Sequence, residues 1–247
     1  MNIRISIINY SNTIPFIFGL ESSEYIKRNS TFFYHYPAQG VELLKNNTVD
    51  ISIVPVATIS EIPNASIVSD FCIGTQKTVA SVKLFSKAPI HVISHIVLDY
   101  QSRTSNLLTQ LLSEEYWKIS PIFSIGKIGY ENDSSIESKV IIGDRALINY
   151  EHYTYSYDLA EEWNKAYSLP FVFACWIANK QIPIDYLNEF NKALEYGINN
   201  IDESIDYCKK DVSFDLRNYL HHNINFYLDT EKRQAMNLFL QKTLQKI

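Results

Sequence analysis

Short apolar segments alternate with helical patterns as far as about residue 177, and this alternation constrains the fold more than any other feature. Residues 3–8 carry isoleucine at every second position and predict a strand with one apolar face. Residues 50–56 are nearly continuous in apolar side chains, as expected for a strand buried on both faces. Residues 102–112 place leucines at helical spacing. Strands that alternate with helices predict an α/β protein with mainly parallel pairing.

The same patterns predict further elements and a change of character near the C-terminus. Strands are expected at 31–36, 66–70, 79–85, 96–99, 140–142, 155–159 and 171–177. Residues 183–247 are charged, poor in glycine and helical, with Thr230 as the N-cap of the last helix. No Gly/Ser linker and no internal repeat divides the chain. Two lobes would therefore be joined by strands rather than by a flexible tether.

Composition and motifs exclude several classes of protein. The formal net charge of −5 argues against a general nucleic-acid-binding surface. Only 7 of the 247 residues are glycine, and neither G-x-G-x-x-G nor G-x-x-x-x-G-K-[ST] occurs, so classical dinucleotide and P-loop sites are not expected. The three cysteines stand far apart, and no C-x-x-C or H-E-x-x-H motif occurs. We therefore expect no disulfide ladder and no metal site.

The N-terminal residues and the cysteines also bear on location. The first residues alternate apolar and polar side chains and lack the unbroken apolar run of a secretory signal. No stretch approaches the roughly 18 apolar residues of a membrane span. Lone cysteines suit a reducing compartment. These features predict a cytoplasmic protein that does not bind membranes.

Residues 98–105, Leu-Asp-Tyr-Gln-Ser-Arg-Thr-Ser, are the most informative candidate for ligand binding. A strand ends there and a helix begins, so unpaired N–H groups meet the positive end of the helix dipole. Ser102, Thr104 and Ser105 add hydroxyl donors that suit a carboxylate or a phosphate. Ordinary N-capping is the alternative, although three hydroxyls and Arg103 exceed what one cap needs. Arg103 either contacts the ligand or pairs with an acidic side chain.

Other polar turns also follow predicted strands. Residues 9–16 place Asn12 and Thr13 at the end of the first strand, where ligands bind in open α/β sheets. A capping turn is the simpler explanation of these two residues. Ser81 lies on a predicted strand and faces either a cleft or solvent. Asp144 follows another strand and acts either as an N-cap or as a ligand contact.

Taken together, these segments resemble the MqnA family, the chorismate dehydratases of the futalosine route to menaquinone. The motifs keep the family's order over most of the chain up to about residue 176. Each motif alone is weak, whereas the ordered set is specific. The segments that carry the resemblance are 11–16, 50–56, 69–74, 81–82, 98–105, 143–147, 158–163 and 169–174.

The resemblance implies a two-lobed α/β fold like that of type II periplasmic binding proteins, with the ligand in a cleft between the lobes. Residues 1–87 and 178–247 are then expected to form one discontinuous lobe. Residues 88–177 form the other, which contains the anion-binding helix start. The two crossover segments are expected near 86–89 and 174–178.

The resemblance also implies a lyase that removes water from chorismate, giving 3-[(1-carboxyvinyl)oxy]benzoate without a metal or a cofactor. Asn12 and Ser81 fall on the family's active-site positions. An amide and an unactivated serine are poor bases, so we expect them to position the substrate and to assist departure of the hydroxyl. The substrate's own enolpyruvyl carboxylate would take the C3 proton. Substrate contacts are expected from Thr13, Thr75, Ser102, Arg103, Thr104, Ser105, Gly143 and Asp144.

Two alternatives remain open at this point. A non-catalytic small-carboxylate binding protein of the same fold would have the same cleft and anion site. The sister enzyme of the pathway, 1,4-dihydroxy-6-naphthoate synthase, shares the fold but acts on another substrate. The segments Ser-Asn-Thr-Ile-Pro at 11–15 and Ser-Arg-Thr-Ser at 102–105 favour the dehydratase. Incubation with chorismate distinguishes the three, because only the dehydratase converts it.

Overall fold

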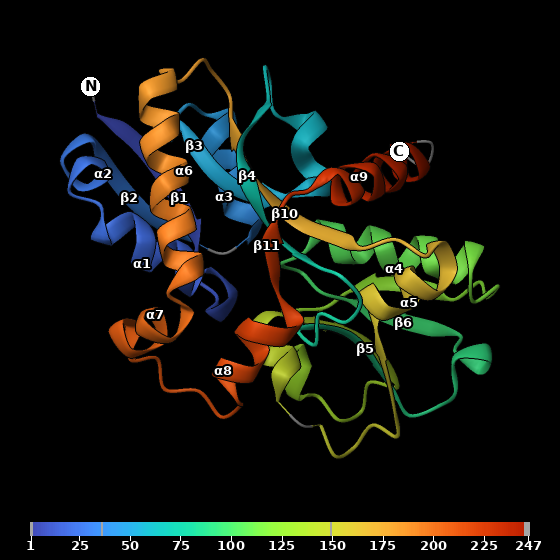
Figure 1. Cartoon of the computed structure of the whole chain (residues 1–247). Helices are drawn as coiled ribbons and strands as arrows, with labels where there is room; N and C mark the ends of the chain where they lie inside the picture. Colours follow the sequence, from blue (N-terminus) through green and yellow to red (C-terminus); the bar gives the residue numbers. More distant parts are fainter. Residues whose placement is uncertain (1, 36, 149, 245–247) are drawn as a thin grey trace.

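The strands of the described residues form two separate sheets (Figure 1). The computed structural model describes residues 2–35, 37–148 and 150–244. The six-stranded sheet consists of β1 (Ile3–Ile8), β2 (Ser30–His35), β3 (Ile51–Pro55), β4 (Ser66–Thr75), β10 (Phe171–Ala178) and β11 (Asn225–Tyr227), in the order β11-β4-β10-β3-β1-β2. The five-stranded sheet consists of β5 (Val82–Ser86), β6 (His95–Leu98), β7 (Ile122–Ile125), β8 (Ser138–Ile142) and β9 (Tyr155–Asp158), in the order β7-β6-β8-β5-β9.

Helices pack around both sheets. They are α1 (Ile14–Ser22), α2 (Glu24–Asn29), α3 (Pro37–Lys45), α4 (Arg103–Glu115), α5 (Leu159–Tyr167), α6 (Ile184–Asn199), α7 (Ile201–Cys208), α8 (Leu216–Asn218) and α9 (Thr230–Leu244). Short helical turns stand between them at Ser11–Thr13, Val56–Glu61, Ile90–Val92, Tyr130–Asn132, Gly143–Leu147 and Tyr219–Asn223. Tyr36, at the end of an expected strand, and residues 245–247 of the expected last helix lie outside the described residues.

Both sheets are mixed, whereas the sequence pattern predicted mainly parallel pairing. Strand β1 pairs in parallel with β2 and β3, and β6 pairs in parallel with β7 and β8, as strand–helix alternation predicts. Strand β10 is antiparallel to β3 and β4, and β5 is antiparallel to β8 and β9. Strand β5 is the strand by which the chain enters the five-stranded sheet. Strand β10 is the strand by which it returns to the six-stranded sheet. The α/β class is confirmed. The antiparallel pairs of β5 and β10 mark the passages between the sheets, and β11 is also antiparallel to β4.

The chain leaves the six-stranded sheet through residues 76–81 and returns through α5 and residues 168–170. The division into lobes at 1–87 plus 178–247 and 88–177 stays a prediction. We call these two connections between the sheets the first and second passages. The sheet to which each strand belongs changes earlier in the sequence than the predicted lobe boundaries, at both passages. Strand β5 already pairs within the five-stranded sheet, and β10 already pairs within the six-stranded sheet.

One buried carboxylate joins the two passages. The Oδ2 atom of Asp158 accepts the N–H groups of Val79 and Ala80 at 3.0 and 2.6 Å. Its Oδ1 atom caps α5 by accepting the N–H groups of Ala160 and Glu161 at 3.0 and 3.2 Å. The first passage and the start of the second are therefore fixed to the same side chain.

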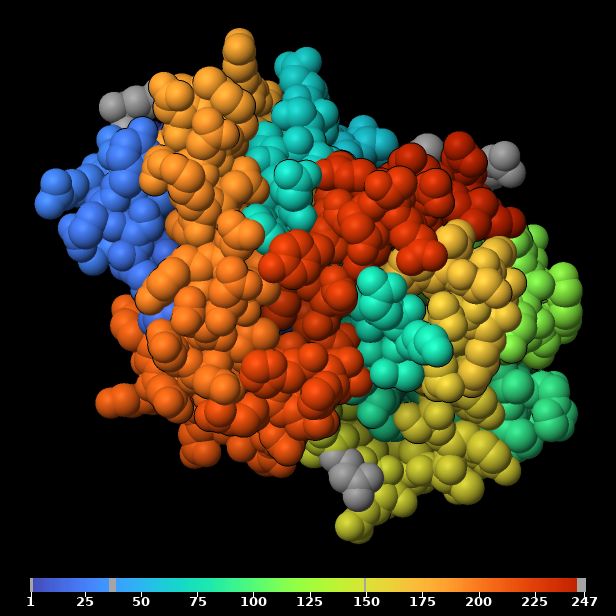
Figure 2. All heavy atoms as spheres, in the orientation of Figure 1, coloured from blue at the N-terminus to red at the C-terminus, as the bar shows by residue number. Residues whose placement is uncertain are grey.

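The C-terminal helix α9 also links the two halves of the molecule. The Phe239 ring lies 6.1 Å from the Trp163 ring of α5 and 5.2 Å from the Phe171 ring of β10. Lys242 pairs with Glu115 at the end of α4 at 2.6 Å. In Figure 2 the C-terminal residues, orange to red, cover the centre of the face shown and reach the yellow segment that includes α5.

Helices α1 and α6 cross at two glycines. A Cβ atom on Gly19 would lie 2.0 Å from the carbonyl oxygen of Ala193, and one on Gly197 would lie 1.8 Å from that of Pro15. Both distances are shorter than van der Waals contact, and the obstacle in each case is backbone. The two helices therefore pack backbone against backbone, and neither position has room for a side chain.

We expect Gly197→Ala to destabilise the protein by about 2 kcal/mol or more, because the added methyl group forces the helices apart. The sign is informative, since alanine in a helix is ordinarily favoured over glycine by about 1 kcal/mol. Denaturant unfolding measures the change. Glu195→Ala, on an exposed position of the same helix, is the control and should change stability by less than about 0.5 kcal/mol. Unchanged or increased stability of Gly197→Ala would contradict the close crossing.

A buried carboxylate paired with two partly exposed cations fixes the start of β3. The Asp50 carboxylate accepts from the Arg4 guanidinium and the Lys180 ammonium group, each at 2.6 Å, and from the Arg4 backbone N–H at 2.8 Å. Burial raises the pKa of Asp50, but the hydrogen bonds from Arg4 and Lys180 lower it more, to about 2. The charged form is therefore favoured in the folded state.

This shift predicts how stability depends on acid. The folded pKa of Asp50 is about 2, below the unfolded value of about 3.9. The stabilisation is complete above about pH 4 and is lost as the pH falls through 2. We expect the stability difference between wild type and Asp50→Asn to shrink by about 2 kcal/mol between pH 6 and pH 2. Denaturant titrations at each pH test this, with Asp211→Asn as an exposed control. A constant difference would argue against the paired carboxylate.

Candidate functional site

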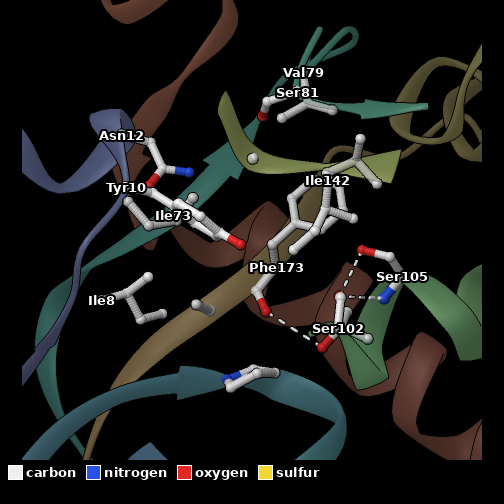
Figure 3. Close-up of a pocket in the computed structure, with 15 residues that line it drawn as sticks. Ile8, Tyr10, Asn12, Ile73, Val79, Ser81, Ser102, Ser105, Ile142 and Phe173 are labelled. Atoms are coloured by element: carbon white, nitrogen blue, oxygen red, sulfur yellow. Dashed lines mark hydrogen bonds between the residues drawn. The ribbon is translucent and has the colours of Figure 1, made fainter. Parts of the chain in front are cut away.

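A cavity of about 60 Å³ lies between the two sheets (Figure 3). Its wall is largely apolar and comes from both sheets, with Ile8 and Ile73 on one side and Ile142 on the other. An apolar hollow with a few convergent polar groups is the usual form of a small-molecule site. Six of the ten residues expected to act on the substrate line this cavity: Asn12, Ser81, Ser102, Thr104, Ser105 and Gly143.

These residues stand next to strand ends. Asn12 lies in the turn after β1, Gly143 begins the turn after β8, and Ser102 precedes α4 in the connection that follows β6. Ser81 directly precedes β5. In Figure 3, Asn12 and Ser81 lie on one side of the pocket, and Ser102 and Ser105 lie on the other. The polar groups therefore form two separate clusters on an otherwise apolar wall.

Three other expected contacts point elsewhere in this structure. The hydroxyls of Thr13 and Thr75 donate to backbone carbonyl oxygens, at 2.8 Å to that of Tyr10 and 2.7 Å to that of Thr78. Arg103 pairs with the carboxylate of Glu61. The sequence left open whether Arg103 meets a ligand or an acidic partner, and here it has an acidic partner.

The start of α4 combines capping with free donors. Ser102 Oγ accepts the N–H of Ser105 at 3.1 Å and donates to Ser105 Oγ at 2.8 Å. Thr104 Oγ1 accepts the N–H of Ala57 at 3.3 Å and donates to the carbonyl oxygen of Phe173 at 3.4 Å. Ser105 Oγ thus keeps its own proton for another acceptor, and the first N–H groups of the helix have no intrahelical partner. This arrangement suits an anionic oxygen.

A buried polar network supports this helix start. Asp99 is fully buried and accepts from Arg145 at 2.9 Å and from the Tyr130 hydroxyl at 2.7 Å. Burial raises the pKa of Asp99, and the positive charge of Arg145 opposes that change. Arg145 also donates to the side-chain oxygen of Gln101 at 3.0 Å, and the hydroxyl of Tyr10 donates to the same oxygen. A hydrogen bond from Tyr10 therefore reaches across from the other sheet.

Position 143 has no room for a side chain, because the Tyr10 ring lies against it. Its φ angle is +64°, in the left-handed region that favours glycine. A Cβ atom there would lie 2.8 Å from the Tyr10 ring. The N–H of Gly143 donates to the carbonyl oxygen of Ser81 at 2.8 Å, so the two cavity residues are held together through their backbones.

Ser81 has a partner that sequence reasoning missed. The hydroxyl of Tyr219 donates to Ser81 Oγ at 2.8 Å, and the Tyr219 side chain is buried. Burial raises the pKa of Tyr219, and hydrogen bonding with Ser81 opposes the change. Tyr219 comes from the C-terminal segment, 138 positions from Ser81. No motif in the sequence marks it, because its relation to the site arises only from the fold.

Asp144 bridges the two sides of the site instead of lining the cavity. Its carboxylate accepts from the backbone N–H and the hydroxyl of Ser11, each at 3.0 Å, and from the Lys210 ammonium group at 2.7 Å. Ser11 follows a strand of one sheet, and Asp144 follows a strand of the other. The contacts hold the two sides of the cavity together.

Comparison with known proteins places the chain in a family. The model of a family described as menaquinone biosynthesis matches residues 3–245. The chain belongs to the menaquinone biosynthesis family. This family member is 27% identical to a chorismate dehydratase from Thermus thermophilus over 165 residues, which are 60% of this chain and 60% of that protein. The match therefore spans less than two thirds of the length of that curated relative.

Solved structures confirm the expected fold. A protein from Archaeoglobus fulgidus matches 99% of this chain and 97% of its own, with a TM-score of 0.76 and 14% identity. The periplasmic aliphatic sulphonate binding protein from Escherichia coli matches 98% and 93%, with a TM-score of 0.60 and 14% identity. At such identities the likeness concerns the fold alone. This member of the menaquinone biosynthesis family thus has the α/β fold of periplasmic binding proteins.

Two features of the described residues bear on other classes of site. No helix among residues 2–35, 37–148 and 150–244 is long and apolar enough to cross a membrane. Within the same described ranges, no three His, Cys, Asp or Glu side chains gather where a metal ion would bind.

We expect Asp144→Ala to loosen the contact between the two sides of the cavity. Hydrogen bonds to a charged group contribute roughly 1.5–3 kcal/mol, so exchange of the Ser11 amide proton should accelerate about 10- to 100-fold. Lys210→Ala should have a smaller effect, because that ion pair is partly exposed. Amide hydrogen exchange by NMR measures both, with Asp211→Ala as the control. Unchanged exchange at Ser11 in Asp144→Ala would show that the contact does not hold the cavity closed.

Proposed function

We propose that this protein removes water from chorismate and gives 3-[(1-carboxyvinyl)oxy]benzoate. One observation carries the proposal. In a single cavity with a largely apolar wall, the hydroxyl-rich start of α4 lies opposite Asn12 and Ser81. Membership of the menaquinone biosynthesis family and the 27% identity to a chorismate dehydratase support the same reaction. The resemblance marks Asn12 and Ser81 as the residues that act on the substrate.

The start of α4 is the proposed binding place for one substrate carboxylate. Ser105 Oγ and the first N–H groups of the helix supply donors there, and the helix dipole adds positive potential. Loss of the C3 proton moves negative charge toward the ring carboxylate. Donors already in place stabilise that charge without reorganisation, as in an oxyanion hole.

The residues of the cavity wall bear on which group accepts the C3 proton. Among the described residues that line the cavity, none carries a carboxyl, imidazole, amine or thiol group. Asn12 offers only hydrogen-bond donor and acceptor atoms. A base supplied by the substrate is consistent with such a wall. The enolpyruvyl group is attached at C3, so its carboxylate lies near the C3 proton.

In the proposed step, the C3 proton passes to the enolpyruvyl carboxylate and its electron pair forms the new ring double bond. The C4–O bond breaks, and its electron pair leaves with the hydroxyl oxygen. The transferred proton completes the water molecule, and the ring becomes aromatic. Asn12 and Ser81 donate hydrogen bonds to the departing oxygen and keep their own protons.

Incubation of the purified protein with chorismate, without added metal or nucleotide, tests the proposal by chromatography with mass detection. We expect a product lighter by one water that retains the enolpyruvyl group. Unchanged chorismate with a folded protein would overturn the proposal. Tight binding without turnover would then identify a carboxylate-binding protein of the same fold, and absence of binding would favour the sister synthase.

Variants of the two cavity residues refine the test. Asn12→Ala and Ser81→Ala should each lower kcat by roughly 10²–10³-fold, the usual cost of one lost transition-state donor. Ser94→Ala, at an exposed position away from the cavity, is the control and should leave kcat unchanged. Asn12→Asp should not exceed the wild-type rate. A faster Asn12→Asp enzyme would show that a protein base helps, which the substrate-supplied base does not predict.

A further inference from the structure

The C-terminal segment contributes a buried hydroxyl to the site, although the sequence motifs of the resemblance end at about residue 176. Tyr219 opens the helical turn at Tyr219–Asn223 and is 3% exposed. It does not line the cavity itself. Its hydroxyl donates to Ser81 Oγ at 2.8 Å. Tyr219 therefore reaches the cavity only through another side chain.

The direction of this hydrogen bond decides what Ser81 can do. A serine hydroxyl has one proton and two acceptor lone pairs. Because Tyr219 occupies a lone pair of Ser81 Oγ, the Ser81 proton is available to another acceptor. Among the described residues Ser81 Oγ donates to no protein acceptor, and the side chain lies on the cavity wall. The Ser81 proton is therefore free for a molecule bound in the cavity.

The surrounding structure holds Tyr219 in place. Its backbone N–H donates to the carbonyl oxygen of Asp215 at 3.0 Å, and its ring lies 6.1 Å from that of Phe214 in an edge-on arrangement. At the far end of the turn, Asn223 donates to Thr78 Oγ1 at 3.3 Å. Thr78 belongs to the passage that leads to Ser81. Both ends of the turn are therefore anchored, one of them to the segment that carries Ser81.

We propose that Tyr219 is a positioning residue whose hydroxyl orients Ser81, so that the Ser81 proton points at the departing hydroxyl group of the substrate. This inference rests on the proposed function, because the departing group belongs to that reaction. It assigns to the C-terminal segment a role in the chemistry.

Tyr219→Phe tests the inference, since it removes one oxygen atom and keeps the ring. We expect kcat to fall about tenfold or more, the effect of about 1.4 kcal/mol in the transition state, with KM within about twofold of wild type. A residue that only filled space would move thermal stability and leave kcat unchanged. The p-aminophenylalanine variant at 219, made by stop-codon suppression, keeps a donor in the same place. It should recover kcat to within about threefold of wild type.

The decisive measurement is a double-mutant cycle with Ser81→Ala. If Tyr219 acts through Ser81, then Tyr219→Phe should change kcat by less than about twofold when Ser81 is already alanine. Tyr186→Phe is the matched control, because Tyr186 is also a buried tyrosine whose hydroxyl bonds to a serine, Ser30, outside the cavity. It should leave kcat and KM unchanged.

Each outcome has one meaning. Wild-type protein that leaves chorismate unchanged overturns the proposed function and this inference with it. Active wild type with an equally active Tyr219→Phe variant overturns the inference alone. Equal losses from Tyr219→Phe with and without Ser81 would show that Tyr219 does not act through that hydroxyl, and would also overturn it. If Tyr219→Phe does not fold, a p-aminophenylalanine variant with kcat lowered tenfold overturns the inference.

Discussion

The arrangement of the two sheets depends on Asp158. This carboxylate is buried and accepts four backbone N–H groups, two from the first passage and two from the start of α5. Burial raises its pKa, and the backbone hydrogen bonds oppose the change. A buried charge without such partners would cost several kcal/mol, so the carboxylate and the two passages stabilise one another. The first passage holds Ala80 at a φ angle of 60°, directly before Ser81. The same carboxylate therefore fixes how Ser81 enters the cavity.

The position of the cavity between the two sheets determines which kinds of residue line it. Loops that follow strands of both sheets supply the polar groups, and strand side chains such as Ile73 and Ile142 supply an apolar wall. In such surroundings the effective dielectric constant is low, so each hydrogen bond to a bound molecule is stronger than in water. A wall without a strong base suits a reaction that rearranges charge within its own substrate. It suits acid–base catalysis by the protein less well.

Local features of the structure could be predicted from the sequence, and long-range ones could not. The strand at 3–8 and the helix from about 102 follow from apolar periodicity, and the structure has β1 at Ile3–Ile8 and α4 at Arg103–Glu115. The antiparallel pairing of β5 and β10 has no local signal, since it depends on where the chain enters each sheet. The partner of Arg103 is 42 positions away, and that of Ser81 is 138 positions away. Helix-start chemistry predicted Ser102, Thr104 and Ser105, which line the cavity, whereas only the fold reveals Tyr219.

The hydroxyl groups around the cavity share a polarity that connects these observations. Ser102 donates to Ser105, and Thr104 donates to a backbone carbonyl, so both protons are used within the protein. Ser105 Oγ and Ser81 Oγ accept hydrogen bonds, and neither donates to any described protein atom. The cavity therefore presents two oriented hydroxyl donors, one at the helix start and one on the side of Asn12. In the proposed reaction, the anionic group of the substrate would meet the first donor, and the departing hydroxyl would meet the second, which Tyr219 holds. A simple anion would need only the first donor.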